Sequence, residues 1–260
     1  MRRWWNRRRF DLIELGWIAL LVGLASWSGG RAALVHGLVI VPSEVEQLAA
    51  TYGPERFSKN EEEWVIRDFF KDRRGGFFID IGANDYKISS NTYFLETRLG
   101  WSGIAVDPQV GFRSGYERFR PKTRLFALFM SDVSNERATL FVPHSNSLVA
   151  SGTREFAEFE GGSVSEVSVQ TITLNDLLDR LGVEGLDLLS IDVELAEPKV
   201  LAGFNIDKFK PGLVCIEDHK EVRQQILDYF SDHRYVVVGR YLRADTKNLY
   251  FAALGRQFEQ

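Results

Sequence analysis

The sequence predicts a doubly wound α/β fold on a mostly parallel sheet, and two features of the chain indicate it. Between residues 75 and 109, an apolar strand, a glycine turn, a helix and a second apolar strand follow one another. The alternation of strand and helix then continues to the C-terminal region, where two strands are adjacent. Such alternation is typical of a parallel sheet that helices cover on both faces.

The first 42 residues form a candidate membrane anchor. Five arginines precede a charge-free stretch at residues 15–30, and a second apolar stretch covers residues 32–42. As a helix, the first stretch would be roughly 24 Å long, somewhat short of the ~30 Å hydrocarbon core. Three interpretations stay open: a signal-anchor helix, a helical hairpin or interfacial anchor that turns at Gly29 and Gly30, and a cleaved signal peptide.

Residues 43–74 are predicted to be a helical linker. Ser43 and Glu46 have the spacing of a capping box, which predicts a helix to about residue 51. Residues 61–71 form a second, amphipathic helix with Trp64 and Val65 facing inward. We therefore divide the chain into an anchor at 1–42, this linker, and one large domain at 75–260.

The large domain contains all the strands that we predict. These strands cover residues 77–81, 103–106, 124–130, 138–143, 164–172, 186–191, 213–217, 235–242 and 248–254. The helices between them cover residues 90–99, 110–119, 173–181, 197–202 and 221–231. Only five residues join the last two strands, which must be antiparallel because a parallel crossover needs about a dozen or more.

Charge and cysteine content exclude several classes of protein. The formal net charge of −4 argues against a nucleic-acid-binding protein that neutralises phosphates. The single cysteine, Cys215, excludes an intrachain disulfide and a cysteine-clustered zinc site. Because it lies in an apolar run, we expect a buried thiol.

Small and acidic residues follow the first two strands, where ligands bind in parallel sheets. Gly82 lets the backbone approach a ligand closely, and Asp107, 27 residues after Asp80, suits the vicinal hydroxyls of a ribose. The full G-x-G-x-x-G pattern is absent, so a pyrophosphate cradle and an NAD(P)-dependent reductase are disfavoured. We predict S-adenosylmethionine as the cofactor, with binding residues Asp80, Gly82, Ala83, Asn84, Asp107 and Pro108.

The chain resembles the FkbM-type methyltransferases in four segments: FFIDIGAND (77–85), SSNTYFLE (89–96), GWSGIAVDP (100–108) and LDLLSIDVELAEPKVLAGF (186–204). The resemblance runs from about residue 75 to the C-terminus. It implies a class I methyltransferase fold, which is Rossmann-like, and S-adenosylmethionine-dependent methyl transfer. The acceptor that it implies is usually a hydroxyl oxygen of a sugar or secondary metabolite, that is, a small molecule or glycan.

Two residues depart from the family pattern, in which glycine commonly stands at the positions of Tyr86 and Leu195. Tyr86 adds an aromatic ring beside the cofactor loop, and Leu195 fills space next to Asp192 and Glu194. The alternative function is therefore a catalytically inactive methyltransferase-fold domain that serves as a binding or scaffold domain at a membrane.

Acidic residues and a histidine follow the later strands and are the candidate catalytic groups. Methyl transfer to a poor nucleophile requires alignment of the reactants and removal of a proton. The candidates for these tasks are Asp192, Glu194, Glu197 and His219. Clustered acids can also bind a divalent cation, but no spacing here specifies one, so we predict no metal.

The arginines before the apolar stretch favour a cytoplasmic N-terminus, so one crossing would export the domain away from its cofactor. A hairpin or interfacial anchor would retain it. We therefore expect a membrane-associated protein with a cytoplasmic catalytic domain.

Overall fold

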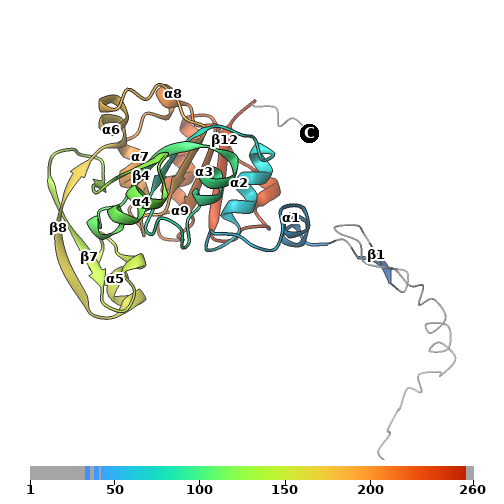
Figure 1. The fold of residues 1–260 in the computed structure, drawn as a ribbon, viewed down its shortest axis with the longest axis horizontal. Coiled ribbons are helices and arrows are strands. Elements are labelled where there is room, and N and C mark those ends of the chain that lie inside the picture. The colour runs from blue at the N-terminus through green and yellow to red at the C-terminus, as the bar shows by residue number, and fades with distance from the viewer. Residues whose placement is uncertain (1–32, 36–37, 41, 256–260) are drawn as a thin grey trace, which may run out of the picture.

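The computed structural model describes residues 33–35, 38–40 and 42–255 (Figure 1). Its main feature is a seven-stranded sheet with the order β11-β12-β10-β9-β3-β4-β5. The strands are β3 (Phe77–Ile81), β4 (Ser102–Val106), β5 (Thr123–Phe126), β9 (Leu188–Ile191), β10 (Leu213–Glu217), β11 (Tyr235–Val237) and β12 (Asn248–Ala253).

The sheet is parallel except at the final strand. The strands from β10 to β5 pair in parallel, whereas β12 is antiparallel to both of its neighbours, β10 and β11. The predicted mostly parallel sheet and its antiparallel last strand are therefore confirmed.

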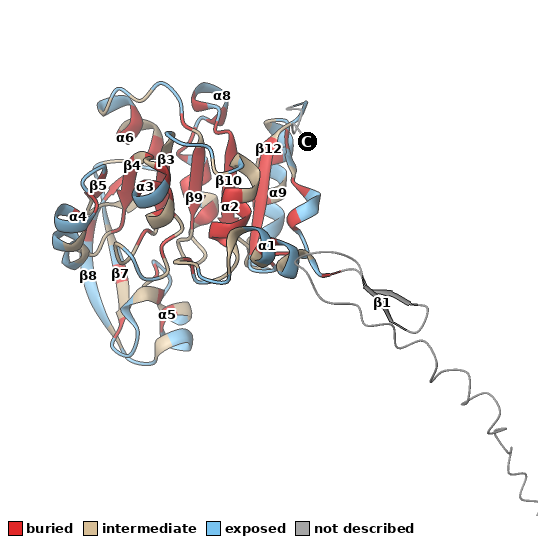
Figure 2. Cartoon of the chain, turned by 45° about the vertical axis from the view of Figure 1, so that its right-hand side comes forward, coloured by how far each residue is buried: buried red, intermediate tan, exposed pale blue. Residues whose placement is uncertain are grey.

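Alternating side chains divide the sheet into two apolar faces, because successive residues of a strand point to opposite sides. Phe78, for example, packs on one face and Ile79 on the other. The first face is covered by α1 (Glu44–Tyr52), α2 (Glu62–Phe70), α3 (Tyr93–Leu99) and α4 (Arg113–Phe119). The second face is covered by α6 (Leu174–Arg180), α7 (Glu197–Ala202), α8 (Ile206–Phe209) and α9 (Arg223–Asp232). Figure 2 shows the buried strands between these layers.

Helices α1 and α2 share the core of the large domain. Ser43 forms the predicted capping box at the start of α1. Trp64 and Val65 of α2 are buried against a cluster that includes Phe78 and Trp101. The segment that we assigned to a linker therefore covers part of the sheet. Cys215 belongs to the same buried cluster and is a free thiol, as predicted.

A second, three-stranded sheet has the order β6-β8-β7 and forms an arm at one edge of the molecule (Figures 1 and 2). It contains β6 (Phe129–Met130), β7 (Arg137–Pro143) and β8 (Val164–Ile172). The predicted strand at 124–130 is wrong as one element, because β5 ends at Phe126 and β6 pairs with β8 instead. The loop between β7 and β8 contains an additional helix, α5 (Arg154–Gly161).

Most of the candidate anchor lies outside the described residues. Two short strands, β1 (Ala33–Val35) and β2 (Leu38–Ile40), pair antiparallel in the second apolar stretch. A helical hairpin would make this stretch its second helix, so that interpretation is wrong for these six residues. Among the residues that the structure describes, no helix is long and apolar enough to cross a membrane.

Candidate active site

The turn after β3 requires glycine. Gly82 has a φ of +80°, and a Cβ at this position would lie 1.6 Å from the carbonyl oxygen of Asp192. The backbone amides of Gly82 and Ala83 donate to the carbonyl of Val106 at 2.9 and 3.2 Å. The turn therefore joins the ends of β3, β4 and β9, and it requires glycine because its backbone approaches the backbone of Asp192 too closely for a Cβ.

Asp107 is held in one orientation at the end of β4. Its two carboxylate oxygens accept hydrogen bonds from the backbone amides of Asn84, at 3.1 Å, and Gln109, at 2.8 Å. Each oxygen keeps a free lone pair, because a carboxylate offers about four acceptor sites. The residue is only 3% exposed, and this burial raises the pKa of Asp107 to about 6.

Asp80 lies at the end of the neighbouring strand β3. Thr92 Oγ1 donates to Asp80 Oδ2 at 2.8 Å. The side chain is buried, and burial raises its pKa above the ordinary value for an aspartate. Nearby, Asn91 Nδ2 donates to Ser190 Oγ at 3.1 Å and thereby connects the segment before α3 to β9.

The segment before α3 is held by a fully buried arginine, Arg120. The guanidinium of Arg120 lies 2.5 Å from Glu96 and also donates to the backbone carbonyls of Tyr86, at 2.9 Å, and Thr92, at 3.2 Å. The 86–92 segment, which supplies the partner of Asp80, is thus fixed to Arg120 at the C-terminal end of α4.

Two adjoining cavities open at the carboxyl ends of the strands. The first is lined in part by Asp107, Pro108, Gln109, Met130 and Leu140. The second is lined in part by Lys59, Asp80, Ala83, Ser89, Asn91 and Asn146. Both are lined by Gly82, Asn84, Leu148, Asp192 and Glu194. All six predicted cofactor residues therefore line one cavity or both.

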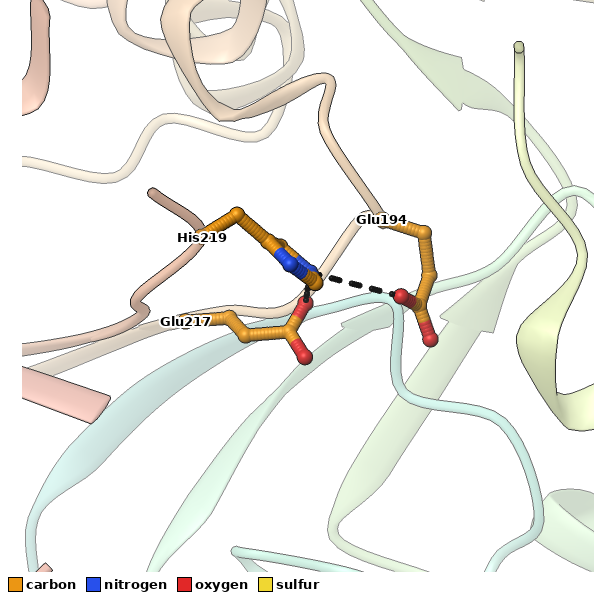
Figure 3. Close-up of side chains that lie close together, drawn as sticks. All are labelled: Glu194, Glu217 and His219. Carbon is orange, nitrogen blue, oxygen red and sulfur yellow. Dashed lines mark ion pairs between the residues drawn. The ribbon is translucent and has the colours of Figure 1, made fainter. Parts of the chain in front are cut away.

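The candidate catalytic residues differ in their access to these cavities. Asp192 and Glu194 line both, whereas Glu197 is fully buried and its Oε1 accepts the backbone amide of Val193 at 3.1 Å. His219 is not among the residues that line either cavity, and its Nε2 atom lies 3.5 Å from Glu194 Oε2 and 2.7 Å from Glu217 Oε2 (Figure 3). The structure thus brings all four together and adds Glu217, which ends β10.

The clustered carboxyl groups are strongly perturbed. Burial is the main cause that raises the pKa of Asp192, of Glu194 and of Glu197, the last to about 7, and the negative charge of Glu217 adds to each shift. The adjacent carboxyl groups of Glu194 and Glu217 raise the pKa of His219 to about 10. These carboxyl groups therefore stabilise a positive charge placed among them.

The two departures from the family pattern lie in different settings. The ring of Tyr86 stacks on Phe119 with centroids 4.8 Å apart and occupies the space above Gly115, and Tyr86 is not among the residues that line either cavity. Leu195 follows Glu194 with a φ of +77°. This left-handed conformation favours glycine and explains why glycine suits the position.

Several lining residues were missed from the sequence. Lys59 lies in a stretch that we interpreted as a linker, and a bridge between Ser58 and Ser89 brings it to the site. Leu148 is held over the glycine turn because Asn84 Nδ2 donates to its carbonyl at 3.3 Å. No local pattern indicates either contact, since both depend on residues distant in the chain.

Comparisons with known proteins identify one family. The family model described as "Methyltransferase FkbM domain" matches residues 80–237. No curated protein matches the sequence. Among solved structures, a precorrin-6y C5,15-methyltransferase from Geobacter metallireducens has 11% identity and a TM-score of 0.41, over 70% of this chain and 76% of its own. A TehB-like SAM-dependent methyltransferase from Corynebacterium glutamicum has 11% identity and a TM-score of 0.41, over 79% and 92%.

Proposed function

Because the chain belongs to the FkbM family of S-adenosylmethionine-dependent methyltransferases, we propose that it methylates a hydroxyl oxygen of a sugar or another small-molecule or glycan acceptor. The observation that carries this proposal is the position of Asp192 and Glu194, which line both cavities. A hydroxyl group is a poor nucleophile and must lose its proton during transfer, so an acceptor for that proton has to lie beside it.

The residues around the glycine turn fit the cofactor. Gly82 lines both cavities without a side chain, and Asp107 keeps lone pairs for two vicinal ribose hydroxyls. The nucleoside would therefore lie in the first cavity, against Asp107 and Pro108. The methionine part would lie against Asp80 and Ala83 in the second.

The chain's own groups would position the acceptor and remove its proton. When bound, the cofactor supplies a methyl group whose bond to sulfur breaks as a bond to the acceptor oxygen forms, with the electron pair remaining on sulfur. Asp192 or Glu194 takes the hydroxyl proton. Lys59, Asn91 and Asn146 offer further hydrogen bonds in the second cavity, and this polar lining favours an acceptor with several hydroxyl groups.

The scaffold alternative rests on Tyr86 and Leu195, and neither residue argues strongly for lost activity. The tyrosine ring packs on α4 rather than in the cavities. Leu195 adopts the left-handed conformation that the turn requires. Turnover by the purified protein separates the two functions, because the scaffold would bind the cofactor without consuming it.

A labelled-methyl assay tests the proposal. The full chain is incubated with methyl-labelled S-adenosylmethionine and a panel of sugars, each paired with its amino-sugar analogue. We expect label in ether linkages and a kcat lower by about 100-fold or more in Glu194→Gln and Asp192→Asn. Glu184→Gln, at an exposed position before β9, should match the wild type. Label found only on amines, or undiminished turnover in both cavity variants, would contradict the proposal.

A further inference from the structure

We propose that Glu194, Glu217 and His219 form a binding site for one divalent cation. Each side chain offers one donor atom, and these atoms all lie within 4.8 Å of one another. Glu217 ends β10 and His219 follows it, while Glu194 comes from the turn after β9, so neighbouring parallel strands bring the three together (Figure 3).

The distances within the cluster suit coordination with small adjustments. His219 Nε2 lies 2.7 Å from Glu217 Oε2 and 3.5 Å from Glu194 Oε2. Metal–ligand bonds of about 2.1 Å at angles between 90° and 109° place neighbouring donors roughly 3.0 to 3.4 Å apart. These two separations lie on either side of this range, and the donor oxygens of Glu194 and Glu217 lie within 4.8 Å of each other, so side-chain movements would bring the three donors into range.

Unpartnered polar atoms provide an independent indication of a missing ligand. Glu217 Oε2 and His219 Nε2 are buried, and although they lie 2.7 Å apart as an ion pair, neither makes a hydrogen bond of acceptable geometry. Glu197 is 0% exposed, and its Oε2 atom also has no partner, although Glu217 and His219 both act electrostatically on this carboxyl group. A buried polar group left without a partner costs about 1–3 kcal/mol, and a cation among these carboxylates would offset that cost.

The donor set indicates the class of metal. Magnesium and calcium prefer oxygen ligands alone, whereas an imidazole combined with carboxylates suits manganese, iron or zinc. Three protein ligands leave coordination positions open, as in catalytic metal sites. Glu194 lines both cavities, so an open position can face the acceptor.

The role of the cation rests on the proposed function, although the site itself does not. A divalent cation that binds the acceptor's hydroxyl oxygen lowers the pKa of that hydroxyl. The proton then passes to Asp192, which lines the same cavities. A cation here selects acceptors with an oxygen that can ligate a metal, and it disfavours purely apolar ones.

The test is a titration of the full chain with Mn²⁺ after removal of metals by a chelator. Electron paramagnetic resonance measures free and bound Mn²⁺, and we expect one bound ion per chain. Glu217→Gln and His219→Ala should each weaken binding about 10-fold or more. His233→Ala is the matched control, because His233 Nδ1 lies 2.7 Å from Asp207 Oδ2 in an imidazole–carboxylate pair outside the proposed site.

A second readout needs no variant, in case either substitution prevents folding. Electron spin-echo modulation of the bound Mn²⁺ in the wild-type protein should show a directly coordinated imidazole nitrogen. No saturable binding, no nitrogen signal, or equal loss in His233→Ala would overturn the site, and the cluster would be an internal ion-pair network. Mn²⁺ binding without methyl transfer would leave the cation site in place and reject the proposed function.

Discussion

At the scale of single residues, the proposed cofactor site can be tested at Asp107. Asp107→Ala would remove the proposed acceptor of the two ribose hydroxyls and should weaken binding of S-adenosylhomocysteine by about 1–3 kcal/mol. Isothermal titration calorimetry measures this difference. Asp132→Ala, at an exposed position after β6, is the control and should bind normally. An unchanged affinity in Asp107→Ala would remove this residue from the site.

The raised pKa of Asp107 also predicts how cofactor affinity depends on pH. Burial raises this pKa to about 6, so the carboxyl group is ionised at pH 7.5 and mostly protonated at pH 5. A protonated oxygen accepts hydrogen bonds less well, and affinity for S-adenosylhomocysteine should therefore fall as the pH drops through 6. In Asp107→Asn this part of the pH dependence should be absent, and an identical profile in both proteins would refute the assignment.

Leu195 provides a residue-scale test of backbone strain. Its φ of +77° costs a non-glycine residue about 1–2 kcal/mol of folding stability. A glycine avoids this strain but lowers folding stability by roughly 0.5–1 kcal/mol, because it has more conformational freedom in the unfolded chain. Leu195→Gly should therefore be more stable than Leu195→Ala by about 0.5–1 kcal/mol in urea denaturation. Both variants lose the side chain, so the comparison isolates the conformation. A less stable glycine variant would show that the turn is not strained.

At the scale of elements, Arg120, the residue that caps the C-terminal end of α4, fixes the segment that leads into α3. Its side chain is 0% exposed and pairs with Glu96, which is also buried. Arg120→Ala would leave the carboxylate buried without its partner, and we expect a loss of about 3–5 kcal/mol in the free energy of unfolding. Thermal and urea denaturation measure the loss. Arg118→Ala, on the exposed side of the same helix, should change stability by less than about 0.5 kcal/mol.

The same Arg120→Ala variant also tests whether the 86–92 segment contributes to cofactor binding. Since Thr92 both contacts Arg120 and donates to Asp80, the folded fraction of Arg120→Ala should bind S-adenosylhomocysteine less tightly. Wild-type stability in this variant would mean that the 86–92 segment is held by other contacts.

At the scale of the whole molecule, the helices before residue 75 are predicted to be essential for folding. Removing residues 1–74 would expose Phe78, Leu95 and Trp101, which pack against Trp64 and its neighbours. A fragment of residues 75–260 should therefore aggregate or lack a cooperative unfolding transition by circular dichroism. A fragment of residues 42–260 should retain one. A stably folded 75–260 fragment would contradict this prediction and support the linker interpretation.

Sequence patterns predicted the main sheet because strand and helix signals are local. Apolar runs bounded by glycine and acidic residues located β3, β4, β9 and β10, and the short connection before β12 required an antiparallel pair. The same patterns located the ends of the strands, and hence the acids at Asp107 and Asp192. What they identified is the part of the site that lies on neighbouring strands.

The remaining contacts depend on tertiary structure. The break after Phe126 follows from pairing between β6 and β8, which are more than thirty residues apart in the chain. Lys59 reaches the second cavity only because the 58–89 bridge places it there. Glu217 was recognised as a strand end, but its convergence with Glu194 and His219 depends on how the turn after β9 folds.

The most direct test of the central claim is a crystal structure of the full chain with S-adenosylhomocysteine. We predict that the ribose hydroxyls lie against Asp107, that the amino acid part lies beside Asp80, and that the sulfur faces Asp192 and Glu194. A ligand bound elsewhere, or an empty crevice at saturating concentration, would contradict the account.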